Sequence, residues 1–213
     1  MSESKVVEEL LESAGTTYAE EAGITLDDKP APLFQLLMLA ELLSAPISAS
    51  IAVTAAEELV RSGYRTPHRV ADAEWQELVD ALGRGHYRRY DETTATRLGA
   101  VATDVLDRYH GDLRELAEEA EDDPRRAAEL LQRFDGIGPT GSAIFLREVQ
   151  DVWPWARPYF DDRVRHGAER LGLPTDPEKL SALAPRHTAA LAAALVRVGR
   201  DDDLADRLRA VAD

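Results

Sequence analysis

The chain has no cysteine, and this absence removes several kinds of chemistry at once. Without thiols it can form no disulfide, no thiolate zinc site, no cysteine-ligated iron–sulfur cluster and no cysteine nucleophile. Lysine is almost as scarce, because only Lys5, Lys29 and Lys179 stand among 25 basic residues. A lysine amine is therefore missing from the whole stretch between residues 29 and 179.

The sequence also lacks a run of about 18 apolar residues, so it predicts no membrane-spanning segment. Residues 1–5 lead into an acidic amphipathic stretch instead of a basic cap and an apolar core, which is unlike a secretory signal. From these two absences we expect a cytoplasmic protein.

The charge is strongly negative, with 40 acidic against 25 basic residues and a formal net charge of −15. Such a balance opposes general attraction to polyanions, so a nucleic-acid role would need a local basic patch. The 44% of hydrophobic residues is enough to fill a core, which argues against a disordered chain.

Apolar residues recur at helical spacing almost everywhere, whereas the alternation typical of strands is scarce. The sequence therefore predicts an all-α protein. The most apolar segment, residues 33–43, is apolar on nearly all sides of a helix, so we expect it at the centre of the fold.

Residues 130–146 hold the most informative pattern, an apolar helix end, the turn Gly136-Ile137-Gly138-Pro139 and a second apolar helix. Glycines permit positive φ and close backbone approach, and the isoleucine fills the gap between the helices. The main-chain N–H groups at the start of the second helix would form a natural anion site. A plain corner between two helices has the same pattern, and that alternative stays open.

Several motifs together resemble the helix-hairpin-helix (HhH-GPD) DNA glycosylases, the endonuclease III-like superfamily. Their order and spacing agree over roughly residues 33–200. They are Leu42-Leu43-Ser44-Ala45, Thr66-Pro67, Gly85-His86-Tyr87, Tyr109-His110-Gly111-Asp112-Leu113, the Gly-Ile-Gly turn, and Trp153-Pro154 followed by Pro158-Tyr159-Phe160-Asp161-Asp162-Arg163-Val164.

The resemblance implies an all-α, two-lobed helical DNA glycosylase-like fold with a helix-hairpin-helix motif, at about residues 130–148, and a central cleft. Residues 33–149 would form the central lobe that ends in the hairpin. Residues 1–32 and 150–213 would together form the second lobe.

The resemblance also assigns the catalytic aspartate to Asp161, whose carboxylate would stabilise an oxocarbenium-like sugar or activate the attacking group. Capping of the following helix is the alternative role for this residue. The lysine that forms a Schiff base in bifunctional members is replaced by Thr140, which offers no amine. An AP-lyase step is therefore not expected.

Other positions follow from the same resemblance. Pro46 replaces the wedging glutamine, so Pro46 or Ile47 would act as an apolar wedge in the DNA. The turn residues Gly136, Ile137, Gly138, Pro139, Thr140 and Gly141 would contact a DNA phosphate. Main-chain carbonyls at Gly136 and Gly138 would hold a monovalent cation, Na⁺ or K⁺, while no metal site built from side chains and no iron–sulfur cluster is expected.

Charge gives an independent indication of a DNA-facing strip. Residues 84–97 and 157–170 together hold eight arginines against five acids, although the rest of the chain is strongly acidic. Among these arginines Arg88, Arg89, Arg163 and Arg165 are the predicted phosphate contacts. The alternative is that they form i,i+4 ion pairs with helix acids.

The leading hypothesis is a DNA repair protein of base excision repair, a monofunctional DNA N-glycosylase. It would be a hydrolase that cleaves the N-glycosidic bond of a damaged or mismatched base in double-stranded DNA, acting as a monomer without a cofactor or a protein partner. A non-catalytic DNA-binding helix-hairpin-helix protein and an acidic helical protein-interaction scaffold are the alternatives.

Overall fold

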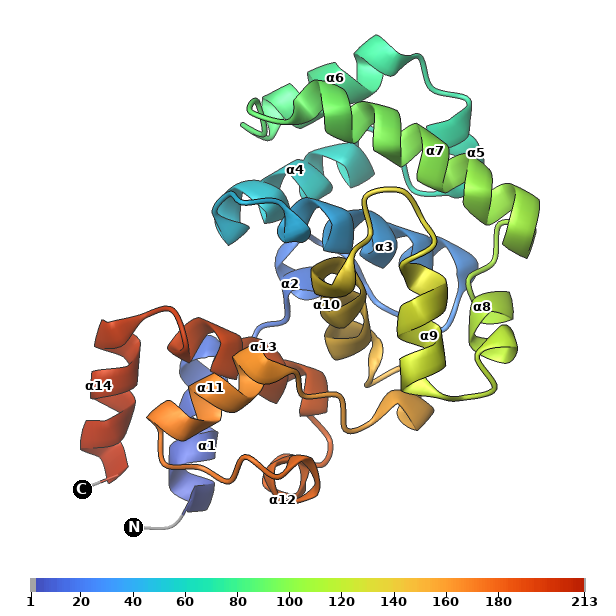
Figure 1. The fold of residues 1–213 in the computed structure, drawn as a ribbon. Coiled ribbons are helices and arrows are strands. Elements are labelled where there is room, and N and C mark those ends of the chain that lie inside the picture. The colour runs from blue at the N-terminus through green and yellow to red at the C-terminus, as the bar shows by residue number, and fades with distance from the viewer. Residues whose placement is uncertain (1–2, 213) are drawn as a thin grey trace. The chain divides into compact units, whose positions relative to one another are not determined.

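Helices make up all the regular structure of residues 3–212, the part of the chain that the computed structural model describes (Figure 1). This confirms the all-α class. In chain order they are α1 (Glu3–Ala14), α2 (Tyr18–Glu21), α3 (Pro30–Ser44), α4 (Ala49–Arg61), α5 (Pro67–Ala71), α6 (Trp75–Arg84), α7 (Asp91–Tyr109), α8 (Arg114–Glu119), α9 (Pro124–Leu131), α10 (Pro139–Val149), the 3₁₀ turn η1 (Pro154–Ala156), α11 (Asp162–Arg170), α12 (Pro177–Ala182), α13 (Thr188–Val198) and α14 (Asp202–Ala212). Within the described range, none of them has both the length and the apolar content that a bilayer span requires.

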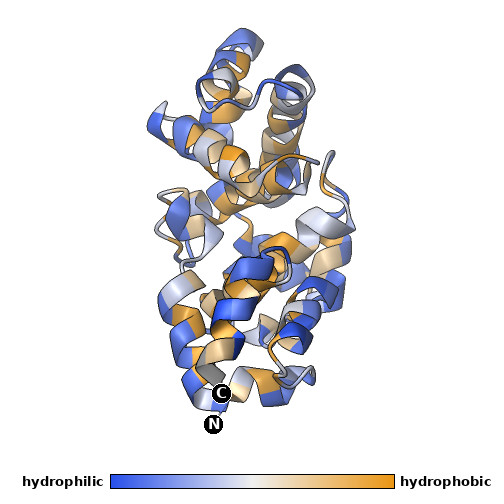
Figure 2. Ribbon diagram, turned by 90° about the vertical axis from the view of Figure 1, so that its left-hand side faces the viewer, coloured by the Kyte–Doolittle hydropathy of each residue, from blue (hydrophilic) through white to orange (hydrophobic). Residues whose placement is uncertain are grey.

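Helix α3 is the buried helix that the apolar run predicts. Eight apolar residues of this helix, which point to all its sides, are each no more than 1% exposed: Leu33, Phe34, Leu36, Leu37, Met38, Leu39, Ala40 and Leu42. Most other helices bury one side only, and Figure 2 shows polar and apolar residues alternating along them.

Local signals set several helix ends. The Ser48 hydroxyl accepts the N–H of Ile51 at 3.4 Å and caps α4, and Thr66 caps α5 ahead of a proline at its first turn. Helix α7 ends where His110 takes a left-handed conformation with φ of 49°, followed by Gly111. Such residues help to satisfy the unpaired backbone N–H and C=O groups at helix ends, so these boundaries can be predicted from the sequence.

The chain forms two compact units. Unit 1 comprises Met1–Tyr18 and Arg147–Asp213, and unit 2 is the continuous stretch Ala19–Leu146. Residues 19–32, which the sequence analysis grouped with the termini, belong to unit 2, and their apolar Ala22 and Ile24 are buried.

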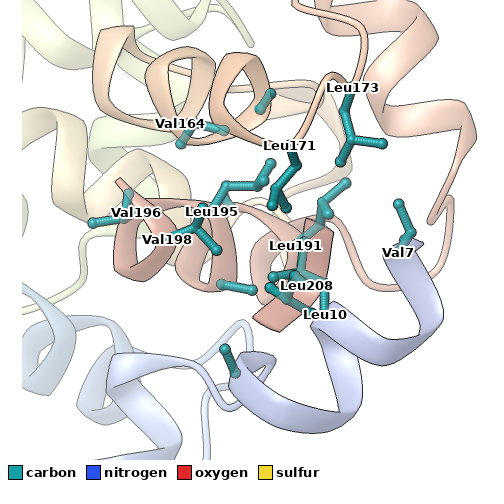
Figure 3. Packing of buried hydrophobic residues seen from close by; sticks show 14 of the residues in the cluster. Val7, Leu10, Val164, Leu171, Leu173, Leu191, Leu195, Val196, Val198 and Leu208 are labelled. Carbon is teal, nitrogen blue, oxygen red and sulfur yellow. The ribbon is translucent and has the colours of Figure 1, made fainter. Parts of the chain in front are cut away.

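Unit 1 is built around α13, against which α1 and α11 pack (Figure 3). Its core draws leucines and valines from α1, α11, α13 and α14, among them Leu10, Val164, Leu195 and Leu208. Helices α11 and α13 touch so closely that a Cβ on Gly167 would lie 2.0 Å from the Leu195 carbonyl oxygen. Only glycine allows this crossing.

Candidate nucleic-acid interface

Residues 124–149 form two helices joined by a tight turn, as the Gly-Ile-Gly pattern predicts. Helix α9 ends at Leu131 and α10 begins at Pro139. The side-chain amide of Gln132 donates to the Ser142 hydroxyl at 3.2 Å, which ties the two helices together. Ile137 is only 3% exposed and fills the space beneath the turn. The segment is therefore a helical hairpin and not one continuous helix.

Gly136 is required by its conformation and by its neighbours. Its φ is +83°, and a Cβ would lie 2.8 Å from Cδ of Arg97 and 2.9 Å from Oε1 of Glu41. A side chain here would meet backbone strain and a steric clash together.

Gly138 differs from Gly136 and from the expected glycine conformation, since its backbone has no positive φ. A Cβ built on it meets no described atom within 4 Å. The position is partly exposed, so the space beside it is open to an external group. A requirement for glycine at this position could come only from a bound partner.

The start of α10 presents free backbone donors beside Gly138. The N–H of Ser142 donates to the Gly138 carbonyl at 3.0 Å, so the N–H groups of Thr140 and Gly141 precede the first helical hydrogen bond. Thr140 is partly exposed, whereas Gly141 is buried against α3 and Ile137. A helix start of this kind favours an anion through N–H donors and the helix dipole.

Glu41 lies directly beneath the turn and is not among the predicted site residues. It is 4% exposed, and neither carboxylate oxygen accepts a hydrogen bond from any residue that the structure describes. Burial raises the pKa of the Glu41 carboxyl to about 8; Arg97 opposes this shift and Asp135 adds to it. The signal in the sequence was a single acid inside the most apolar helix.

Asp161 lies in unit 1 at the start of α11 and serves as its N-cap. Its Oδ1 accepts the N–H of Val164 at 3.2 Å, and its Oδ2 forms an ion pair with Arg147, whose side chain is only 4% exposed. The Asp161 side chain is 20% exposed. The capping geometry that the sequence analysis held open is therefore present, and a buried arginine adds to it.

The predicted wedge residues lie on the surface of unit 2, between α3 and α4. Pro46 is exposed and Ile47 is partly exposed. The N–H of Ile47 donates to the Ala45 carbonyl at 2.8 Å, which turns the chain sharply.

The predicted arginine contacts divide into two groups. Arg88 and Arg89 are exposed between α6 and α7, where the Arg89 guanidinium lies 5.3 Å from the centre of the Tyr90 ring. On α11, Arg165 forms an ion pair with Asp162, whereas Arg163 forms none within the described residues. Among these four, Arg165 alone has a local ion pair with a described residue, and its spacing is i,i+3 instead of the expected i,i+4.

Metal ligands are sparse in the described residues, where no group of three or more histidine, aspartate or glutamate side chains is placed to hold a metal ion. Since the sequence has no cysteine, a cysteine-ligated cluster has no ligands in this chain.

Neither a protein-family description nor a curated protein matches this sequence. Solved structures do match its backbone, among them two complexes of endonuclease III with DNA. One is endonuclease III trapped as a covalent intermediate with DNA, in an estranged-adenine complex, with 16% identity and a TM-score of 0.50. The other is a non-covalent endonuclease III–DNA complex, with 18% identity and a TM-score of 0.50. Each match covers 94% of this chain and 87% of the other, so the all-helical fold of this protein is similar to that of endonuclease III.

Proposed function

We propose that this protein is a DNA repair glycosylase of the helix-hairpin-helix superfamily that removes a damaged or mismatched base without an AP-lyase step. The observation that carries the proposal is the helical hairpin with open space beside Gly138, in a fold similar to that of endonuclease III. The solved structures with that fold are DNA complexes, so DNA is the partner to test first.

The hairpin would bind one phosphate of a DNA strand through backbone donors. The N–H groups of Thr140 and Gly141 follow Gly138, at which an added Cβ would meet no described atom within 4 Å. A monovalent cation at the carbonyls of Gly136 and Gly138 would lie close to Glu41, whose Oε1 is 2.9 Å from the position of a Cβ on Gly136, and would favour the ionised form of that carboxyl group.

Gly138→Asp tests the hairpin, with Gly138→Asn as the neutral control of the same shape. The aspartate variant would place a negative charge beside the phosphate and weaken duplex binding by about tenfold, corresponding to roughly 1.4 kcal/mol. The asparagine variant should lose much less affinity. Fluorescence anisotropy with a labelled duplex measures both, and equal losses would show that no phosphate lies beside this position.

Asp161 would supply the negative charge that stabilises the sugar as the glycosidic bond breaks. The Val164 amide and the Arg147 guanidinium hold its two oxygens, so the carboxylate is oriented before any substrate arrives. Electrostatic catalysis requires such a charged group to be fixed in place beforehand.

The test is Asp161→Asn against Asp162→Asn, since Asp162 is the exposed neighbour on the same helix turn. Purified protein is first screened against duplexes containing uracil, oxidised, alkylated or mismatched bases. On the best substrate, Asp161→Asn should lower the rate of base release at least about 100-fold and leave duplex affinity within about twofold. Asp162→Asn should retain both activities.

The cap and ion pair of Asp161 also support a second function, that of a DNA-binding hairpin protein without catalysis. Both contacts stabilise α11 without any substrate, so they account for the residue on structural grounds alone. If no duplex in the screen loses a base while duplex binding is intact, this second function is the correct one.

The missing lysine gives a separate test of the proposed chemistry. Borohydride should trap no covalent protein–DNA adduct at residue 140, because a threonine hydroxyl cannot form an imine with the sugar. Trapping that survives removal of every lysine and of the N-terminal amine, but disappears in Thr140→Ala, would contradict this account.

A further inference from the structure

A hollow of about 320 Å³ lies on unit 1 between the first turns of α11 and the end of α13. Its volume is at the lower end of the roughly 300–1,000 Å³ typical of ligand pockets. The residues that line it are Asp162, Arg163 and His166 from α11, and Val196, Gly199 and Arg200 from α13 and the residues after it.

The close crossing of the two helices explains why the hollow exists. Gly167 touches the Leu195 carbonyl, and Arg163 lies four residues earlier, on the same face of α11. Arg163 is thereby directed toward the end of α13. Gly199 has no side chain, and a Cβ there would lie 3.4 Å from Cδ2 of His166. The space therefore depends on a glycine that a larger residue would fill.

Two arginines, Arg163 and Arg200, line this hollow together with one acid, Asp162, which is paired with Arg165. Neither Arg163 nor Arg200 forms an ion pair or a side-chain hydrogen bond with any residue that the structure describes. Burial lowers the pKa of Arg163, the charges of Arg200 and Arg147 lower it further, and Asp161 and Tyr18 oppose the shift. The two positive charges are thus close enough to repel each other.

The nearby carboxylates are engaged elsewhere. Asp161 is paired with Arg147, and Asp162 with Arg165. Asp201 accepts the N–H of Leu204 at 3.0 Å, and Asp202 pairs with Arg170 at 2.5 Å. In a protein with a net charge of −15, the hollow is thus lined by two arginines that form no ion pair with a described residue and by one acid, Asp162, whose ion pair is with Arg165.

We propose that this hollow binds one phosphate group, with the guanidinium groups of Arg163 and Arg200 donating hydrogen bonds to its oxygens. The planar fork of a guanidinium matches the oxygens of a phosphate, and an anion between the two arginines would relieve their repulsion. The His166 ring N–H provides a further donor on the α11 side. The phosphate comes either from a DNA backbone, in which case the site extends the proposed function, or from a free phosphate or monoester.

The first experiment follows the Arg163 and Arg200 Nε–Hε signals by NMR in the whole ¹⁵N-labelled protein. Inorganic phosphate is titrated against sodium chloride of equal ionic strength. A bound phosphate should shift both signals in a saturable way, while the Arg207 signal, from an exposed arginine on α14, should not respond. This experiment needs no DNA, so it stands even if the proposed function fails.

The second experiment compares two double variants in duplex binding at several salt concentrations. Arg163→Gln/Arg200→Gln removes the proposed contacts, and Arg186→Gln/Arg207→Gln removes the same charge from exposed positions of unit 1. If a backbone phosphate occupies the hollow, the first variant should lose about tenfold in affinity. The number of counterions released on DNA binding, obtained from the salt dependence of the affinity, should fall by about one. The second variant should change little. Gly199→Val, which fills the hollow and keeps both arginines, should behave as the first variant does.

The outcomes separate the sources of the phosphate. Loss of duplex affinity in the Arg163/Arg200 and Gly199 variants, with or without shifts from inorganic phosphate, supports a DNA backbone phosphate. Saturable shifts without an effect on duplex binding, or in a protein that binds no duplex, support a free phosphate or monoester. No saturable shift together with equal duplex binding by both double variants overturns the proposal.

Discussion

Glu41→Gln should change how the stability of the protein depends on pH. The Glu41 carboxyl is buried beneath the hairpin turn, and burial raises its pKa from 4.5 to about 8. In the unfolded chain the same group titrates near its ordinary value. Between these two values the folded protein holds a proton that the unfolded chain releases, so the free energy of unfolding falls as the pH rises.

The size of this effect follows from the shift. Each pH unit inside the window lowers the free energy of unfolding by about 1.4 kcal/mol. From pH 4.5 to pH 7 the loss therefore amounts to roughly 3 kcal/mol, and the whole window to roughly 5 kcal/mol. Below pH 4.5 and above pH 8 this group adds no further dependence. Glutamine keeps the shape and carries no charge, so the variant should lack this contribution.

Urea unfolding followed by circular dichroism, at half-unit intervals from pH 4.5 to 8.5, measures the effect. The control is Glu57→Gln, at an exposed position of α4, which should follow the wild type at every pH. The series is run in sodium chloride and again in choline chloride, because a cation bound at the turn would stabilise the ionised Glu41 and reduce the shift. If the free energy of unfolding changes with pH in the same way for Glu41→Gln and the wild type, in both salts, the buried carboxyl does not have the raised pKa assigned to it.

Two pairs of glycine variants test the backbone arguments through urea unfolding. Gly136→Ala should destabilise the protein by about 2 kcal/mol or more, because φ of +83° and two close side chains oppose a Cβ, whereas Gly138→Ala should stay within about 0.5 kcal/mol. A similar cost for both would contradict the distinction between the two turn positions. Gly167→Ala should destabilise unit 1 by at least about 2 kcal/mol because its Cβ would overlap α13, while Gly99→Ala, in open space on α7, should stabilise the protein by about 0.5–1 kcal/mol. If Gly167→Ala leaves the free energy of unfolding unchanged, α11 and α13 are farther apart than they are in this structure.

The features that sequence predicts well here are the local ones. Apolar periodicity identifies α3, and Ser48, Thr66 and His110 mark helix ends through contacts within a few residues. The turn at Gly136 can be predicted in the same way, because a positive φ in a tight turn favours glycine. The endonuclease III-like fold follows from the spacing of many such local motifs together.

The features that sequence misses depend on contacts between distant residues. The pairing of Asp161 with Arg147 joins two helices, and no pattern shows that this arginine is buried. Arg163 and Arg165 look equivalent in the sequence, yet only Arg165 finds an acid on its own helix turn. Glu41 stands in an apolar helix, but its effect depends on Gly136 and Arg97, which come from two other parts of the chain.

The interleaved make-up of unit 1 has a consequence for synthesis on the ribosome. Helix α1 emerges before the helices that it packs on, α13 and α14, and before Arg197, which donates to the carbonyls of Ala14 at 2.9 Å and Thr16 at 2.7 Å. At roughly 5–20 residues per second, these partners are made about 10–40 s later. Meanwhile all of unit 2 leaves the ribosome in one uninterrupted piece. Through that interval the apolar side of α1 lacks the two helices that cover it in the folded unit.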